Sequence, residues 1–174
     1  QHLDFDSFLS NTIVIEVQKQ KPGFNILRRR IAILLGQWIT VKVSAENRPL
    51  VYNIFQHLLD PNDSCNDQVV RITAGRQLKQ IVDDWEFSPE QFLPHVQTTM
   101  SQLLNLIEEV ENMETKMALL NTISVLVERL EHHVSVIHIR TEILQLTSAR
   151  SRLMQKRSSA FCPIFGNNLE MSIS

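Results

Sequence analysis

The sequence contains few of the residues that break regular structure or support special chemistry. Four glycines and six prolines among 174 residues are too few for a sheet protein with many tight turns. The two cysteines, Cys65 and Cys162, lie far apart without CxxC spacing, which excludes a disulfide framework and is typical of a reducing compartment. The longest apolar run, Ile31 to Leu35, is far shorter than the ~20 residues that cross a bilayer, so no contact with a membrane is expected. The chain begins with Gln1, and we interpret it as a piece of a longer soluble protein.

The sequence also lacks an excess of either charge. Seventeen Lys and Arg residues against nineteen Asp and Glu residues give a net charge of -2, so no overall field draws the chain to nucleic acid or an anionic membrane. The composition, 43% hydrophobic and 21% charged, is that of one ordinary globular domain or a piece of a larger protein. Abundant Leu, Ile, Gln and Glu favour helix, so we expect an all-α protein.

No motif predicts catalysis, a cofactor or a metal. GxSxG, P-loop, GxGxxG and HExxH motifs are absent from the sequence, and four glycines are too few for a phosphate-binding loop. His132, His133 and His138 are close in sequence, but no cysteine lies at a zinc-finger spacing from them. The adjacent carboxylates Asp83–Asp84 and Glu108–Glu109 point about 100° apart on a helix and are expected to be solvated or helix-end charges. The protein is therefore not expected to be an enzyme.

An internal repeat is the most informative feature. The segment from Asn25 to Val43 contains three consecutive arginines followed by an apolar stretch, and a shift of about 43 residues aligns it with a second segment. A further shift of about 45 residues reaches a third segment. Equivalent positions are Arg28, Arg71 and Lys116; Ile31, Ala74 and Leu119; and Leu35, Leu78 and Ile123. The spacing within each segment is helical.

Each repeated segment is preceded by another amphipathic segment. The predicted helix pairs are 5–20 with 24–42, 48–60 with 68–85, and 89–110 with 114–131. Asp60–Pro61 is expected to end one helix, and Ser88–Pro89 to begin another. Two helices in each period of ~40 to 47 residues indicate HEAT rather than armadillo repeats. We therefore expect an α-α superhelix of about three helix pairs plus a partial fourth.

The predicted domain organisation follows from these pairs. Residues 1–131 form the HEAT-repeat array, with pairs at about 5–42, 48–85 and 89–131. Residues 132–153 are expected to form a divergent helix or a partial repeat, and a basic patch of Arg150, Arg152, Lys156 and Arg157 crosses the end of this segment. Residues 154–174 have no lasting period and are expected to be a loosely ordered tail.

The arginines and the aromatic residues are expected to stabilise the fold rather than to bind a ligand. A basic residue near the start of the second helix can pair with an acid in the preceding loop, such as Asp63 or Asp67 for Arg71. The same structural role is favoured for Arg28 to Arg30 over a nuclear signal or a contact with nucleic acid. Four aromatic residues are expected to pack in the core rather than stack on a ligand: Trp38, Phe55, Trp85 and Phe87.

Several long blocks together resemble the importin-β (karyopherin) family of nuclear transport receptors. They are LRRRIAILLGQWITVK, RPLVYNIFQHLLD, VVRITAGRQLKQIVDDWEF and QFLPHV, in that order, within about residues 25–131. The resemblance implies a superhelix of about twenty HEAT repeats that binds protein cargo, nucleoporins and the GTPase Ran, and shuttles between cytoplasm and nucleus. Ran contacts mainly the amino-terminal repeats in this family, so any contact with Ran is expected through parts absent here. The repeat pattern alone would also allow a generic HEAT scaffold or adaptor for protein–protein interaction.

The resemblance also indicates a candidate binding face. In karyopherins the second helix of each pair lines the concave side, and its face opposite the core is offered to partners. On the second pair this face carries Thr73, and on the first it carries Ile33 and Thr40. The candidate partner-binding residues on it are Arg30, Gln37, Arg76, Gln80 and Asp83. A protein partner is expected there, not a nucleic acid.

Overall fold

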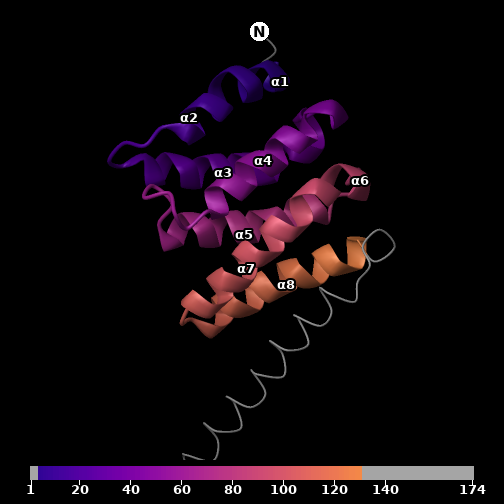
Figure 1. Ribbon diagram of the computed structural model, residues 1–174. Helices are drawn as coiled ribbons and strands as arrows, with labels where there is room; N and C mark the ends of the chain where they lie inside the picture. The colour runs from indigo at the N-terminus through magenta and orange to yellow at the C-terminus, as the bar shows by residue number, and fades with distance from the viewer. Residues whose placement is uncertain (1–3, 131–174) are drawn as a thin grey trace, which may run out of the picture. The chain divides into compact units, whose positions relative to one another are not determined.

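The computed structural model describes residues 4–130 (Figure 1). The predicted divergent helix at 132–153, the tail at 154–174 and the three histidines considered as metal ligands lie outside the described residues. Within residues 4–130 the structure contains helices and turns and no strand. The all-α fold class is therefore confirmed.

The helices follow one another in pairs from the top to the bottom of Figure 1. The first pair contains α1 (Phe5–Phe8), the π-helical turn η1 (Leu9–Ile13) and α2 (Val14–Gln18), followed by α3 (Phe24–Lys42). The second pair consists of η2 (Ala45–Asn47) and α4 (Arg48–Leu59), followed by α5 (Gln68–Val82). The third consists of α6 (Pro89–Phe92), η3 (Leu93–His95) and α7 (Val96–Glu109), followed by α8 (Met113–Leu130).

Local sequence signals fix the helix ends. Asp60 follows the last residue of α4, and Pro61 prevents the helix from continuing. Ser88 is the N-cap of α6, with its Oγ accepting a hydrogen bond from the backbone N–H of Gln91 at 3.4 Å. Gly23 precedes α3 with a φ of 83°, a left-handed conformation that glycine adopts without steric cost.

The second helices of the three pairs, α3, α5 and α8, form one packed layer, because α5 packs extensively against both α3 and α8. Leu35, Leu78 and Leu126 are fully buried in it. The helices approach closely at Gly75, where a Cβ atom would lie 2.5 Å from Cδ2 of Leu119. At the same place the Thr122 hydroxyl donates a hydrogen bond to the Gly75 carbonyl at 3.0 Å.

The aromatic predictions are correct for two residues and wrong for two. Phe55 and Phe87 are buried. Trp85 is 80% exposed because α5 ends at Val82, before helical spacing could carry Trp85 back to the core. Trp38 stacks on Phe5 with 6.2 Å between ring centroids, but 42% of its surface is exposed. Neither tryptophan is a core residue.

Candidate interaction surface

Arg28 joins the first helix pair to the second. It lies in the first turns of α3 and is fully buried. Its Nη1 lies 2.8 Å from Oδ1 of Asp63 and donates a hydrogen bond to Oδ1 of Asn66 at 2.7 Å. Burial alone would raise the pKa of Asp63, but hydrogen bonds from Arg28 and the backbone N–H of Cys65 outweigh it and hold that pKa below its usual value. The carboxylate is therefore charged and paired at neutral pH.

Arg71 makes the equivalent connection one pair later. Its Nη1 and Nη2 donate to Oε1 and Oε2 of Glu109 at 3.0 and 2.6 Å, a bidentate pair. The hydrogen bond from Arg71 lowers the pKa of Glu109. The prediction that Arg71 pairs with Asp63 or Asp67 is therefore wrong. Asp67 instead accepts a hydrogen bond from Asn25, because each loop faces the second helix of the preceding pair.

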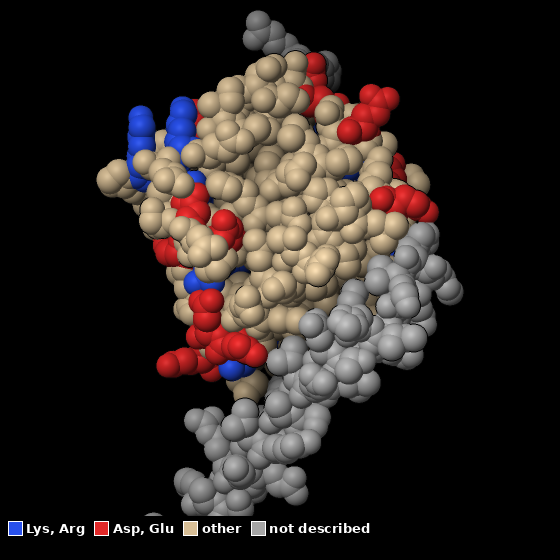
Figure 2. Space-filling model, viewed as in Figure 1, with Lys and Arg blue, Asp and Glu red and all other residues tan. Residues whose placement is uncertain are grey.

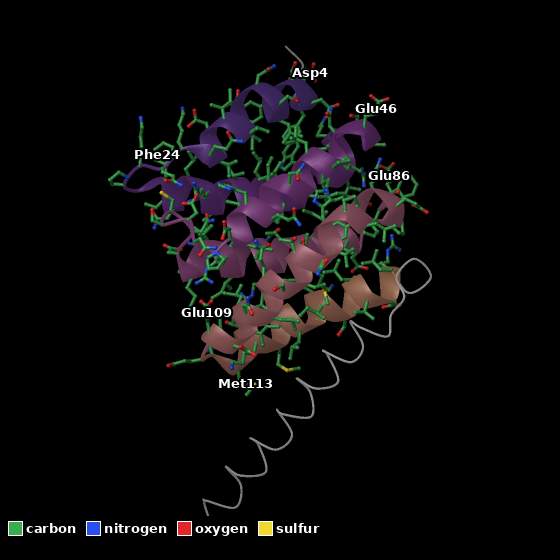
Figure 3. The ribbon with its side chains drawn as sticks, in the orientation of Figure 1. Asp4, Phe24, Glu46, Glu86, Glu109 and Met113 are labelled. Atoms are coloured by element: carbon green, nitrogen blue, oxygen red, sulfur yellow. The ribbon has the colours of Figure 1, made fainter. Side chains whose placement is uncertain are left out.

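Arg48, at the start of α4, forms a third network. Its Nη1 donates to Oδ2 of Asp84 at 2.8 Å and its Nη2 to Oε2 of Glu86 at 2.6 Å. Asp84 is buried, so the expectation of a solvated charge is wrong, whereas its position directly after the C-cap of α5 agrees with a helix-end charge. Figure 3 shows Glu86 on the opposite side of the array from Glu109, so arginines bind acids at both ends of the pairs.

Sequence reasoning missed Arg48, although a signal for it exists. Arg48 binds acids 36 and 38 residues downstream, and Arg71 binds Glu109 38 residues downstream. An arginine at a helix start followed by an acid at this separation is the pattern that would have identified it. Arg28, Arg48 and Arg71 are hereafter called the buried arginines.

The predicted partner-binding residues lie on two neighbouring helices. Arg30 and Gln37 are exposed on α3, and Arg76, Gln80 and Asp83 are exposed on α5. Among the other residues assigned to this face, Thr40 is exposed, whereas Ile33 and Thr73 are half-buried. The structure therefore presents the predicted residues to solvent on adjacent helices.

The charges on this face differ in how they are paired. Asp83 lies 3.4 Å from the Lys79 ammonium. Arg29, Arg30 and Arg76, hereafter the exposed arginines, have no carboxylate within ion-pair distance among residues 4–130. A positive charge therefore remains available on the surface of α3 and α5.

The first helices of the second and third pairs present a different surface. Residues 49–59 of α4 and residues 96–107 of α7 contain no Asp, Glu, Lys or Arg. Figure 2 shows the corresponding central area without charged side chains, while charges lie at its margins. The exposed residues there are uncharged and polar: Asn53, Gln97, Thr98, Ser101 and Asn105.

Other kinds of site find no support within the described part of the chain. Residues 4–130 contain no group of three or more His, Cys, Asp or Glu side chains placed to hold a metal ion. In the same range no helix is both long and apolar enough to span a membrane.

Stacked helix pairs with a continuous core define an α-helical repeat protein of the HEAT type. The chain is 37% identical over 132 residues to Importin-11 of Homo sapiens and 38% identical over 127 residues to Importin-11 of Mus musculus, covering 76% and 73% of this chain. It is 31% identical over 148 residues to the importin beta-like protein KAP120 of Saccharomyces cerevisiae, covering 83% of this chain. The resemblance to the importin-β-like karyopherins is therefore confirmed.

These relatives are much longer than the chain. The matched region spans 13% of each Importin-11 protein and 14% of KAP120. No protein-family model matches the chain. No solved structure matches it either.

Proposed function

We propose that this chain is a segment of a nuclear transport receptor that carries proteins through the nuclear pore. The observation that carries the proposal is the 37% identity to human Importin-11 across 132 residues. Such a match includes both helices of several pairs, whereas a shared HEAT pattern alone would preserve mainly the apolar spacing. A whole receptor of this kind would bind protein cargo, nucleoporins and Ran, and would move between cytoplasm and nucleus.

Within that receptor, the exposed face of α3 and α5 is the proposed contribution to partner binding. Arg30 and Arg76 are its charged residues without a carboxylate partner in the described structure, and Gln37 and Gln80 add exposed amide groups. Charged and amide side chains that are not used within the fold can form hydrogen bonds to a partner without losing internal ones. The uncharged surface of α4 and α7 is available to a second partner, for which nucleoporins are the proposed class.

A chimeric receptor tests the transport function. Residues 4–130 would replace the matched segment of human Importin-11, and nuclear accumulation of an Importin-11 cargo would be measured in permeabilised cells with and without Ran and GTP. A control chimera would carry an unrelated HEAT array of the same length. We expect import by the first chimera and not by the control. Equal import by both, or by neither, would favour the generic HEAT scaffold instead.

The chimera also tests the binding face. Arg30→Glu together with Arg76→Glu should reduce cargo retention, whereas a charge reversal of equal size elsewhere, Lys21→Glu with Lys42→Glu, should not. Circular dichroism would show that both variants keep the helical content of the parent. If the Arg30 and Arg76 variant retains cargo with unchanged salt dependence, these repeats act as a spacer.

A further inference from the structure

The exposed arginines are the charges that the described fold leaves without an opposite charge. Arg29, Arg30 and Arg76 are all exposed, while the buried arginines each bind at least one carboxylate. A single exposed arginine is ordinary, but three on neighbouring helices create a local positive potential. This surface is therefore complementary to a negatively charged partner.

Two acids near the exposed arginines are already engaged. Asp67, the N-cap of α5, accepts hydrogen bonds from the backbone N–H of Val70 and the side chain of Asn25, both at 2.8 Å. These bonds hold the pKa of Asp67 below its usual value, against the opposing effect of burial. Asp83, near the other end of α5, pairs with Lys79. Neither carboxylate is positioned by the fold to bind Arg30 or Arg76.

Aliphatic side chains lie near these arginines on the same helices, because Ile26 precedes Arg29 by three residues and Val69 precedes Arg76 by seven. Ile26 is 68% exposed at the start of α3, and Val69, its equivalent at the start of α5, is 51% exposed. Ile33 and Ile72 are half-buried further along the same two helices. None of these side chains is aromatic, whereas proteins that bind single-stranded nucleic acid stack bases on aromatic rings. The mixture of arginine and aliphatic residues favours a peptide over a nucleic acid.

The register of the two helices defines the spacing of the arginines. Gly36 packs against Gln77 and Asn25 binds Asp67, so residues that lie side by side differ by about 41 or 42 in number. Arg76 is therefore four or five residues beyond the position beside Arg30, ~6–7.5 Å along the helix axes, on a helix ~8–10 Å away. A peptide in the polyproline II conformation rises ~3.1 Å per residue and returns to the same side every third residue, so two such side chains are ~9 Å apart. Acidic residues three apart match this spacing.

The net charge also differs from one helix pair to the next. Residues 4–42 contain six Lys or Arg and three Asp or Glu, whereas residues 88–130 contain two and six. Figure 2 shows Lys and Arg side chains at the upper left and Asp and Glu side chains at the lower left. Residues 43–87 contain four Lys or Arg and seven Asp or Glu, so the second pair is also negative overall. The field of the array therefore draws an acidic partner to the first pair, and on the second pair such a partner depends on the local contact with Arg76.

We propose that the start of α3 and the middle of α5 bind an acidic, aliphatic-containing peptide segment of a protein cargo through Arg29, Arg30 and Arg76. The inference rests on the proposed function, because it names the chemistry of the partner that the α3–α5 face receives. The carboxylates of the segment form charge-assisted hydrogen bonds to the guanidinium groups. Its apolar side chains cover Ile26 and Val69.

Fluorescence polarisation of labelled peptides on the full chain tests this directly. The probe is a twelve-residue peptide of Asp-Ile-Ala repeated four times, and its controls contain Ser or Lys in place of Asp. Arg29→Gln, Arg30→Gln and Arg76→Gln in one chain should weaken binding of the acidic probe at least tenfold. Lys21→Gln, Lys42→Gln and Lys116→Gln, which remove the same charge elsewhere, should change it less than twofold. Raising the salt concentration should weaken binding to the unmodified chain much more than to the triple arginine variant.

Three results would overturn the proposal. They are equal binding of the Asp and Ser peptides, unchanged binding after loss of the three arginines, and binding of a uridine oligonucleotide but not of the acidic peptide. Circular dichroism of every variant separates these results from a failure to fold. The import experiment with the chimera is independent of this assay. If the chimera needs Arg30 and Arg76 to retain cargo but the acidic peptide does not bind, the peptide chemistry is wrong and the transport function stands.

Discussion

The buried and the exposed arginines show how one residue type takes two roles within a few residues of sequence. Arg28, Arg29 and Arg30 are consecutive, yet Arg28 is fully buried against Asp63 and the next two are exposed. Neighbouring residues on a helix point about 100° apart, so the side chains of three consecutive arginines lie in different surroundings. The triplet is therefore not one functional unit. Arg28 connects helix pairs, and Arg29 with Arg30 faces solvent.

The largest effect is expected from the removal of a buried arginine. Arg28→Met leaves Asp63 and Asn66 buried without their partner and should lower the free energy of unfolding by about 3–5 kcal/mol. Urea unfolding followed by circular dichroism would measure the difference. Combining Arg28→Met with Asp63→Asn should restore part of the loss, because no uncompensated charge then remains. A cost below ~1 kcal/mol for the single variant would contradict the structural role of Arg28.

A second substitution tests the seam between the second helices. Gly75→Ala would place a Cβ atom 2.5 Å from Leu119 and 3.1 Å from Leu103, and should destabilise the chain by about 1–3 kcal/mol. Gly36→Ala would place a Cβ atom 2.9 Å from Cβ of Gln77, which is fixed to the α5 backbone, so its cost should be similar. Melting temperatures of the two variants provide the comparison. A larger loss for Gly36→Ala would show that α3 and α5 pack more tightly than α5 and α8.

The pH dependence of stability tests a buried group that precedes α7, the first helix of the third pair. His95 is buried beside Tyr52 with 5.7 Å between ring centroids, and its Nδ1 lies 3.0 Å from Oε1 of Gln56. Burial lowers the pKa of His95 below 6.5, so the unfolded chain binds a proton more readily than the folded one. Stability from neutral His95 is then complete above pH 6.5 and is lost as the pH falls below it. The melting temperature should fall modestly on acidification, and less so in His95→Gln.

The smallest expected effect concerns the exposed arginines. Arg30→Gln with Arg76→Gln removes no ion pair within residues 4–130 and should change the free energy of unfolding by less than ~0.5 kcal/mol. Differential scanning calorimetry on this variant and on the unmodified chain would measure it. A clear loss of stability would mean that these arginines support the fold, and would weaken their assignment to a binding face.

Much of the fold follows from the sequence because helical spacing and helix-end signals act locally. Leu35 and Leu78, placed at equivalent positions of a repeat, are both fully buried. Asp60 and Ser88 lie at the helix ends where their side-chain chemistry predicts them. The exposure of Arg30 and Arg76 follows from the same spacing, since they lie opposite the apolar stripe.

The incorrect predictions concern residues whose burial or partner depends on a neighbouring helix. Trp38 has the helical spacing of a core residue, and its equivalent on α5, Ile81, is buried. Ile81 is buried because α3 packs against α5. Among the described residues no second helix precedes α3, so Trp38 stays partly exposed. The sequence predicts a partner for Arg71 in the loop before α5, but its partner is Glu109 of the third pair. Sequence order alone does not show that the end of each pair's first helix faces the second helix of the preceding pair. The binding role of the face remains a prediction.

The separation between the buried arginines and their partners has a consequence for how the protein is made. Arg28 binds Asn66 and Arg71 binds Glu109, each 38 residues later, and Arg48 binds Asp84 after 36 residues. A growing chain leaves the ribosome from its amino terminus, so each guanidinium emerges before the group that will hold it. Arg28 and Arg71 therefore stay unpaired until the first helix of the next pair has been synthesised, and Arg48 until α5 of its own pair has been synthesised. Translation that pauses inside the array would prolong that state and leave the nascent chain open to chaperones and proteases.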